Sequence, residues 1–457
     1  QPVAGQYRGE MQAAIPIPPA AKSAAATAKR NAEIRERIDL PGGLFDHAAT
    51  HPAPTDADEF TLADAAPEHA LRTDSGLQPV ATPEPGGLRQ VVGDYRLVNT
   101  REGLDDMVRT LREQLEQAQR DGQEAWLAVD TETDARGSMA SNLCGIALSA
   151  REATGYYVAV KGAGDCVDEM TVRECLGPLL SDASVKKIGQ NLKYDINSLR
   201  NYGLQLNGVH LDTMVASYVL DSSRLSHGMD ALAADFLGLR CIPITDLIGK
   251  GAKQISFADV PLDRATGYAA EDADVTLRLA HALAPRLAAM GPETQTLYHD
   301  VEMPLVQVLA DMEYHGVMID ARLLKNLSAE IEKKLFDLQA RIKAAAGRDF
   351  NQDSPRQLAE VLFKHLGLPV IKKTKTGPST DITVLEKLAD RHPVPALVVE
   401  YRSLAKLKNT YLDTLSHLAN EKTKRVHAHF NQTVAETGRL SSSDPNLQNT
   451  QVKTDLG

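Results

Sequence analysis

The stretch EAWLAVDTETD, residues 124–134, joins a short apolar run to a group of acids. Trp126 to Val129 is apolar and has the length of a buried strand. Asp130 and Glu132 follow two positions apart, so an extended backbone places both carboxylates on one face. Two like charges at the end of a buried strand repel each other unless a cation neutralises them. The stretch predicts a strand that carries a metal site, although an ordinary acidic turn also explains the Asp-x-Glu pattern.

Strand and helix patterns alternate around this stretch. DYRLVNTREGLDDMVRTLREQLEQAQ, from Asp94, predicts a short strand and then an amphipathic helix. GYYVAVKG predicts another strand, and ASVKKIGQNLKYDINSLRNYG predicts a strand that leads into a helix. This alternation is typical of an α/β domain, which we place at residues 94–290.

Two later segments add further acids. KKIGQNLKYDINSL places Asp195 on the first turns of a predicted helix, and in GYAAEDADVTLRL Tyr268 and Asp272 lie four positions apart on one helix face. Each acid alone is also typical of an exposed helix start. Together, three elements that each present an acid favour one convergent site for hard cations such as Mg²⁺ or Mn²⁺. Two such ions can activate a water and stabilise the departing oxygen of a phosphodiester. Tyr268 could orient that water.

The motifs VDTETD, GQNLKYD and YAAEDADVT resemble the three motifs of the DEDD group of 3′→5′ exonucleases, in its tyrosine-containing branch. The resemblance is closest to the proofreading domain of bacterial family A DNA polymerases, and it implies an RNase H-like fold with a mixed sheet flanked by helices. It implies that two divalent ions, Mg²⁺ or Mn²⁺ with Zn²⁺ as an option at one site, are bound by four acids. Asp130, Glu132 and Asp272 would hold one ion, and Asp195 with Asp130 the second. The implied catalytic residues are Asp130, Glu132, Asp195, Tyr268 and Asp272.

A second, mainly helical region follows residue 290, and its charge differs from that of the whole chain. Between Lys364 and Arg425, twelve Lys or Arg residues face six acids, in a chain of net charge −11. This balance suggests a polyanionic partner, although a solvated helix face explains it equally well. YRSLAKLKNTYLDTL and RVHAHFNQTVAETGRLSSSDPNLQN resemble the start of a family A polymerase domain. The resemblance implies a helical thumb at residues 291–425 and the first strands of an incomplete palm at 426–457.

The resemblance and the basic charge together predict contacts with DNA. Gln190 and Asn191 match family positions near a frayed single-stranded 3′ end, and Arg439 would by resemblance reach the minor groove near a primer terminus. Lysines of the second region could neutralise phosphates of a primer-template duplex without reading sequence. The predicted DNA-binding residues are Gln190, Asn191, Lys372, Lys373, Lys406, Lys408, Arg439, Asn446 and Gln448.

The two ends of the chain give further expectations. Residues 1–93 are rich in Ala, Pro and acids and predict a linker or poorly ordered arm. No apolar run approaches the ~20 residues that span a bilayer, so we expect no membrane contact. The family resemblance implies a monomer in the bacterial cytoplasm, associated with the nucleoid. In the family, the palm aspartates lie beyond DPNLQN, so we expect a fragment that keeps exonuclease activity and DNA binding without synthesis.

Two alternative functions stay open. An RNase D-like 3′→5′ exoribonuclease would carry similar acidic motifs, but it would leave TGRLSSSDPNLQN and the basic region unexplained. A non-catalytic DNA-binding fragment is the second alternative. An incomplete palm could leave its remaining strands unpaired and prone to aggregation, and the fragment could then bind DNA without hydrolysing it.

Overall fold

The computed structural model describes residues 87–135, 137–375 and 377–448. All of them belong to one structural unit, Leu77–Gly457. The arm expected at residues 1–93 therefore lies mostly outside the described residues. Within that range, strand β1 (Arg89–Gln90) pairs in parallel with β8 (Leu239–Arg240), so backbone pairing begins before Asp94.

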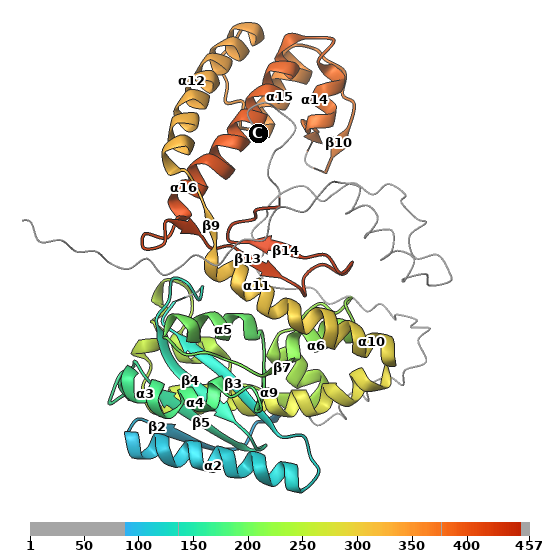
Figure 1. Cartoon of the computed structure of the whole chain (residues 1–457). Helices are drawn as coiled ribbons and strands as arrows, with labels where there is room; N and C mark the ends of the chain where they lie inside the picture. The colour runs from blue at the N-terminus through green and yellow to red at the C-terminus, as the bar shows by residue number, and fades with distance from the viewer. Residues whose placement is uncertain (1–86, 136, 376, 449–457) are drawn as a thin grey trace, which may run out of the picture. The chain divides into compact units, whose positions relative to one another are not determined.

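A mixed six-stranded sheet forms the centre of the first region (Figure 1). Strands β3, β4 and β5 form antiparallel neighbours, whereas the pairs β2–β5, β3–β6 and β6–β7 are parallel. The predicted α/β class with a mixed sheet is confirmed. In spatial order the strands are β2 (Asp94–Val98), β5 (Thr154–Ala159), β4 (Leu143–Ser149), β3 (Trp126–Thr133), β6 (Lys186–Gly189) and β7 (Val209–Asp212).

Helices cover both faces of this sheet. Residues of β4 alternate between two cores: Ile146 and Leu148 share a core with α2 (Arg101–Arg120), and Ala147 shares the other with Ala269 and Ala273 of α9 (Leu262–Ala289). This period of two is what an extended strand between two helical layers requires. The other helices of the region are α3 (Glu169–Cys175), α4 (Gly177–Ser181), α5 (Leu192–Asn201), α6 (Thr213–Leu220), α7 (Met229–Leu232) and α8 (Ile244–Ile248).

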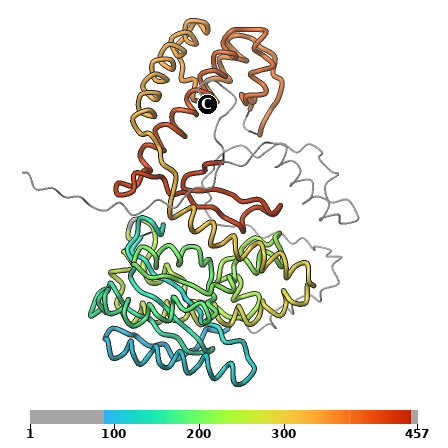
Figure 2. The backbone as a smooth tube through the Cα atoms, viewed as in Figure 1, coloured from blue at the N-terminus to red at the C-terminus, as the bar shows by residue number. Residues whose placement is uncertain are grey.

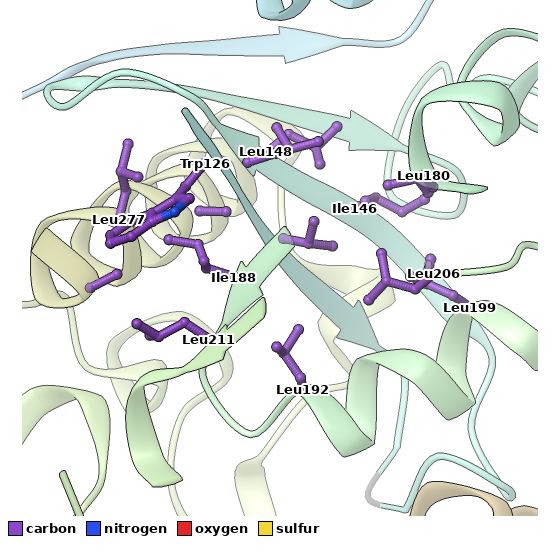
Figure 3. Packing of buried hydrophobic residues seen from close by; sticks show 14 of the residues in the cluster. Trp126, Ile146, Leu148, Leu180, Ile188, Leu192, Leu199, Leu206, Leu211 and Leu277 are labelled. Carbon is purple, nitrogen blue, oxygen red and sulfur yellow. The ribbon is translucent and has the colours of Figure 1, made fainter. Parts of the chain in front are cut away.

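The larger core ties the strands to the second half of α9. Figure 3 shows Trp126, Ile188, Leu211 and Leu277 in this core, from β3, β6, β7 and α9 respectively. All four are buried. Their packing fixes the direction in which β3 leaves the core, and so the position of the acids that follow it.

The second region is helical and has its own cores. Helices α12 (Ala321–Ala346) and α15 (Pro393–Lys406) run side by side (Figure 2) and bury Leu338 and Ile342 against Val394 and Val398. The other described α-helices are α10 (Pro292–Thr296), α11 (Met303–His315), α13 (Pro355–Ala359), α14 (Ile382–Leu388) and α16 (Thr414–Leu418), and π-helical segments are η4 (Leu297–Glu302), η5 (Glu360–His365) and η6 (Leu407–Asp413). Among the described residues of this region, three antiparallel pairs of strands accompany the helices: β9 (Val317–Met318) with β12 (Arg425–Val426), β10 (Lys373–Thr374) with β11 (Gly377–Pro378), and β13 (His429–Asn431) with β14 (Ser441–Ser443).

Local sequence explains where the longest helix of this region begins and ends. The carboxylate of Asp320 accepts hydrogen bonds from the first backbone N–H groups of α12, and Gly347 ends the helix in the left-handed conformation that glycine adopts readily. Within the described residues, no helix is both long enough and apolar enough to cross a membrane.

Candidate active site

Three of the predicted acids converge at the end of β3. Trp126–Val129 are buried, and the strand continues past them through Asp130 and Glu132 to Thr133. Asp272 reaches the same place from α9. Each of the three carboxylates offers an oxygen, and these oxygens lie within 4.8 Å of one another. The structure therefore joins residues that lie more than a hundred positions apart in the sequence.

Tyr268 lies one turn before Asp272 on α9, as the spacing predicted. Its ring packs against Phe257, with ring centroids 6.2 Å apart. Burial raises the pKa of the Tyr268 phenol, and the charges of Asp272 and Glu132 raise it further. The hydroxyl therefore keeps its proton at neutral pH and is a hydrogen-bond donor beside the acids, with Asp272 as its acceptor in this structure.

Asp195 approaches β3 from its open edge. Strand β6 pairs with β3 only as far as Ala128, so the remainder of β3 is not paired with β6 on that side. After β6 the chain turns at Asn191, which has a φ of 63°, and enters α5. Thr131 then donates a hydrogen bond to Asp195 at 2.6 Å. Asp195 is outside the group of three acids, yet its charge contributes to the raised pKa of Glu132.

The four acids share an environment that disfavours negative charge. Burial raises the pKa of Asp130 to about 6. Burial, together with the neighbouring carboxylates, raises the pKa of Glu132, Asp195 and Asp272 well above the usual values. A divalent cation would remove this repulsion, and a donor set made only of carboxylate oxygens fits Mg²⁺ or Mn²⁺.

Asp212 supports the site and was missed by sequence reasoning. Its carboxylate accepts hydrogen bonds from the backbone N–H groups of Leu192 at 2.7 Å and of Asn191 at 3.1 Å, at the start of α5. The same carboxylate caps α6 through Met214 N at 2.9 Å. The Asp-Thr pair before an apolar run is a recognisable cap for α6. Its action on α5, some twenty positions earlier, depends on the pairing of β6 with β7.

The two residues predicted to meet a 3′ end lie just before α5. The Gln190 side chain donates to the carbonyl of His227 at 2.8 Å and accepts from the Thr213 hydroxyl. Its amide is thus engaged within the protein. Asn191 makes no side-chain cap bond, although it precedes α5. Contact of these residues with DNA stays a prediction.

The predicted lysines of the second region differ in exposure and pairing. Lys373 on β10 and Lys406 at the end of α15 are exposed. Lys372 is also exposed and pairs with Asp381 at 3.0 Å, whereas Lys408 is mostly covered and pairs with an acid, Asp413, at 2.8 Å. Exposed lysines are the better candidates for phosphate contacts, because a covered and paired ammonium must first give up its partner.

Three predicted DNA-binding residues follow β13. Arg439 is exposed in the loop between β13 and β14. Asn446 and Gln448 lie beyond β14, where the Asn446 side chain accepts from the backbone N–H of Gln448 at 2.9 Å. The Gln448 side chain donates to the carbonyl of Leu440 at 2.8 Å. This last bond joins the end of the described chain to the residue before β14.

A large cavity lies away from the acids. It has a volume of about 1440 Å³ and is lined by α2, the start of β3 and the end of α9. Trp126 and His281 are stacked at its wall, with ring centroids 5.2 Å apart. None of the five predicted catalytic residues lines this cavity.

The fold and the acid cluster define a 3′-5′ exonuclease domain. The sequence profile of the 3′-5′ exonuclease family matches residues 95–288, which include all five predicted catalytic residues. Domains of this family are metal-dependent, in agreement with the acidic cluster. The profile of DNA polymerase family A matches residues 321–457. In these two ranges the chain is similar to the 3′-5′ exonuclease family and to DNA polymerase family A respectively.

Individual relatives agree with this assignment. DNA polymerase I of Pseudomonas aeruginosa is 42% identical over 396 residues, which are 79% of this chain and 43% of that protein. DNA polymerase I of Rhizobium leguminosarum is 42% identical over 354 residues, 72% of this chain and 34% of that protein. The chain thus spans less than half the length of these relatives. A solved structure, the POL domain of Pol1 from M. smegmatis in complex with DNA primer-template and dNTP, aligns with a TM-score of 0.61 and 29% identity, over 72% of this chain and 53% of that one.

Proposed function

We propose that this chain hydrolyses DNA from the 3′ end, using the acids at the end of β3, as the proofreading activity of a DNA polymerase I-type protein in replication and repair. The observation that carries the proposal is the approach of carboxylate oxygens of Asp130, Glu132 and Asp272 within 4.8 Å of one another, where Asp272 is buried and the other two are half-buried. The match of residues 321–457 to DNA polymerase family A, beside the match of residues 95–288 to the 3′-5′ exonuclease family, supports DNA as the substrate.

The acids would hold two divalent ions, Mg²⁺ or Mn²⁺, in two overlapping groups. Asp130, Glu132 and Asp272 form the first group, and Asp195 with Asp130 forms the second. When bound, the ions would activate a water and stabilise the departing 3′ oxygen. Thr131 keeps Asp195 in place through its hydrogen bond of 2.6 Å.

Tyr268 would orient the attacking water. Its hydroxyl keeps its proton because burial and the neighbouring carboxylates raise its pKa. A protonated phenol one turn from Asp272 can donate to a water oxygen and so fix the direction of the lone pair that attacks phosphorus. Hydrolysis adds this water across the terminal phosphodiester and leaves a strand shorter by one nucleotide.

Comparison of DNA with RNA separates this function from its alternatives. A single-stranded DNA and an RNA of the same sequence, both labelled at the 5′ end, are incubated with the protein and Mg²⁺. We expect the DNA to shorten from its 3′ end faster than the RNA. Faster shortening of the RNA would favour an RNase D-like enzyme. Binding of DNA without metal-dependent shortening would favour the non-catalytic alternative.

The second region would hold the duplex part of a primer-template through its basic surface. This role is supported by the excess of lysine and arginine between Lys364 and Arg425 in an acidic chain. Phosphate contacts of this kind give affinity without sequence preference. We further propose that the protein acts as a monomer in the bacterial cytoplasm, in association with the nucleoid.

Replacement of Lys373 tests the duplex contact. Lys373→Ala should weaken duplex binding and reduce the slope of log affinity against log salt by about 0.9, because one phosphate contact is lost. Lys387→Ala is the matched control, since Lys387 is an exposed lysine of the same basic segment that is not among the predicted contacts. Fluorescence anisotropy at several salt concentrations measures the duplex affinity and its salt slope for each variant. Equal slopes for the two variants would contradict the assignment of Lys373.

A further inference from the structure

Helix α5 presents two different faces, and only one of them belongs to the acid cluster. Asp195 projects toward β3, where it accepts the hydrogen bond of Thr131. Lys193, Asn197 and Arg200 follow the spacing of one helix face, on the side that packs against α11. Asn197 donates to the carbonyl of Ala310 at 3.1 Å.

The α11 side of this contact is centred on Glu313. Its carboxylate accepts from the ammonium of Lys193 at 2.5 Å. The side chains of Glu313 and Lys193 are only 4% and 10% exposed. In a buried pair the geometry is held tightly, because any separation leaves a charge without solvent or partner. Glu313 therefore holds α5 in place at Lys193, two residues before Asp195.

The same carboxylate also binds strand β13. The backbone N–H of Phe430 on β13 donates to Glu313 at 2.7 Å, and the imidazole of His429 lies 3.5 Å from the second carboxylate oxygen. His427 contacts the carbonyl of Glu313 at 2.8 Å. Burial favours a raised pKa for Glu313, but His429 and Lys193 outweigh it and hold the pKa below its usual value.

Glu313 is thus bonded to two parts of the chain that match different family profiles. Lys193 lies within the range matched by the 3′-5′ exonuclease profile, and Phe430 within the range matched by the DNA polymerase family A profile. Glu313 itself lies between the two matched ranges. We propose that Glu313 is a positioning residue that sets the place of Asp195 through Lys193, and that β13 holds Glu313 in this role through the Phe430 N–H.

The inference rests on the proposed function, in that Asp195 is taken to be a metal-binding acid. It predicts that metal affinity depends on a residue that cannot itself touch the metal, because Glu313 lies across α5 from Asp195. Replacing a group that supports a metal ligand commonly weakens metal binding by about 10-fold. Loss of the Glu313 charge should have an effect of this size on Mn²⁺.

The first experiment separates positioning from folding. Mn²⁺ binding to the whole chain is measured by calorimetry, and unfolding by thermal denaturation, for Glu313→Gln and for the double variant Lys193→Met/Glu313→Gln. We expect the dissociation constant for Mn²⁺ to rise about 10-fold in both. The single variant should also unfold at a lower temperature, because Lys193 stays buried without its partner, and the double variant should recover. Recovery of Mn²⁺ affinity together with stability would overturn the positioning role.

The second experiment tests the contribution of β13. Residue 430 pairs with Ser442, and its N–H points to Glu313 and away from β14, so proline at this position removes one outward-facing donor. Phe430→Pro should weaken Mn²⁺ binding about 3-fold relative to Phe430→Ala, which keeps the N–H and removes the same ring. Equal Mn²⁺ affinity in these two variants would contradict the role of β13.

A control on the same interface completes the design. Arg200 and Asp311 form an ion pair of 2.7 Å between α5 and α11, but the Asp311 side chain is 45% exposed. Asp311→Asn should leave Mn²⁺ affinity within about 2-fold of wild type, because exposed pairs contribute little. A larger loss there would show that any damage to the interface has the effect, and would overturn the assignment to Glu313. A wild-type chain that binds Mn²⁺ but does not shorten DNA would instead contradict the proposed function and leave the affinity comparison valid.

Discussion

Asp130→Asn should lower the rate of hydrolysis at the 3′ end by about 10⁴-fold, which corresponds to ~5 kcal/mol of transition-state stabilisation. Asp130 is the acid proposed to be shared by both metal groups, so its loss weakens both together. Asparagine keeps the size of the side chain and removes the charge. The metal-free variant should unfold about 2 °C higher than wild type, because one of several buried like charges is gone.

Asp274→Asn is the matched control for this prediction. Asp274 is a fully buried acid of α9, two residues after Asp272, but it accepts bonds from Tyr95 at 2.8 Å and from the backbone N–H of Ala153 at 2.8 Å. Its replacement should lower stability and leave the hydrolysis rate of the folded protein within about 3-fold of wild type. Equal loss of activity in the Asp130 and Asp274 variants would contradict the division between acids that take part in hydrolysis and acids that support the fold.

Asp212→Ala should produce the largest loss of stability among the changes considered, about 3 kcal/mol in the free energy of unfolding. Its carboxylate accepts backbone hydrogen bonds at the starts of both α5 and α6. Alanine leaves these N–H groups unpaired in a buried place, where each unpaired donor is costly. Because α5 carries Asp195, the variant should also require more Mg²⁺ for hydrolysis than wild type.

Chemical denaturation measures the stability change, and Asp212→Asn is the conservative comparison. Asparagine keeps one acceptor oxygen, so about half of the lost free energy should return. If the Asp212→Ala and Asp212→Asn proteins were both as stable as wild type, Asp212 would not be the cap of α5 that the geometry indicates.

The buried part of β3 and the acids that follow it could be predicted because their sequence signals are local. The apolar run that ends at Val129 predicts the buried strand by itself, and the spacing of Asp130 and Glu132 places both acids on one face. The pair Tyr268 and Asp272 likewise needs only the period of a helix. These positions follow from two periodicities, of 2 and 3.6 residues, that a sequence displays directly.

The supporting groups could not be predicted because their partners are distant in sequence. Asp212 acts on α5 only because β6 and β7 are neighbours in the sheet. Glu313 contacts Lys193 and Phe430, which lie 120 and 117 positions away. Gln190 resembles a DNA contact in its motif, yet its amide is bonded to His227 and Thr213. Such contacts depend on the packing of whole elements, which no local pattern contains.

The central claim is tested most directly by the product ladder from a 5′-labelled single-stranded DNA. With Mg²⁺, the wild-type chain should shorten the strand one nucleotide at a time from its 3′ end, and removal of the metal by chelation should stop the reaction. Asp130→Asn should leave the strand intact over the same time. A ladder from the Asp130→Asn protein equal to that of wild type, or wild-type cleavage that begins inside the strand, would contradict the account.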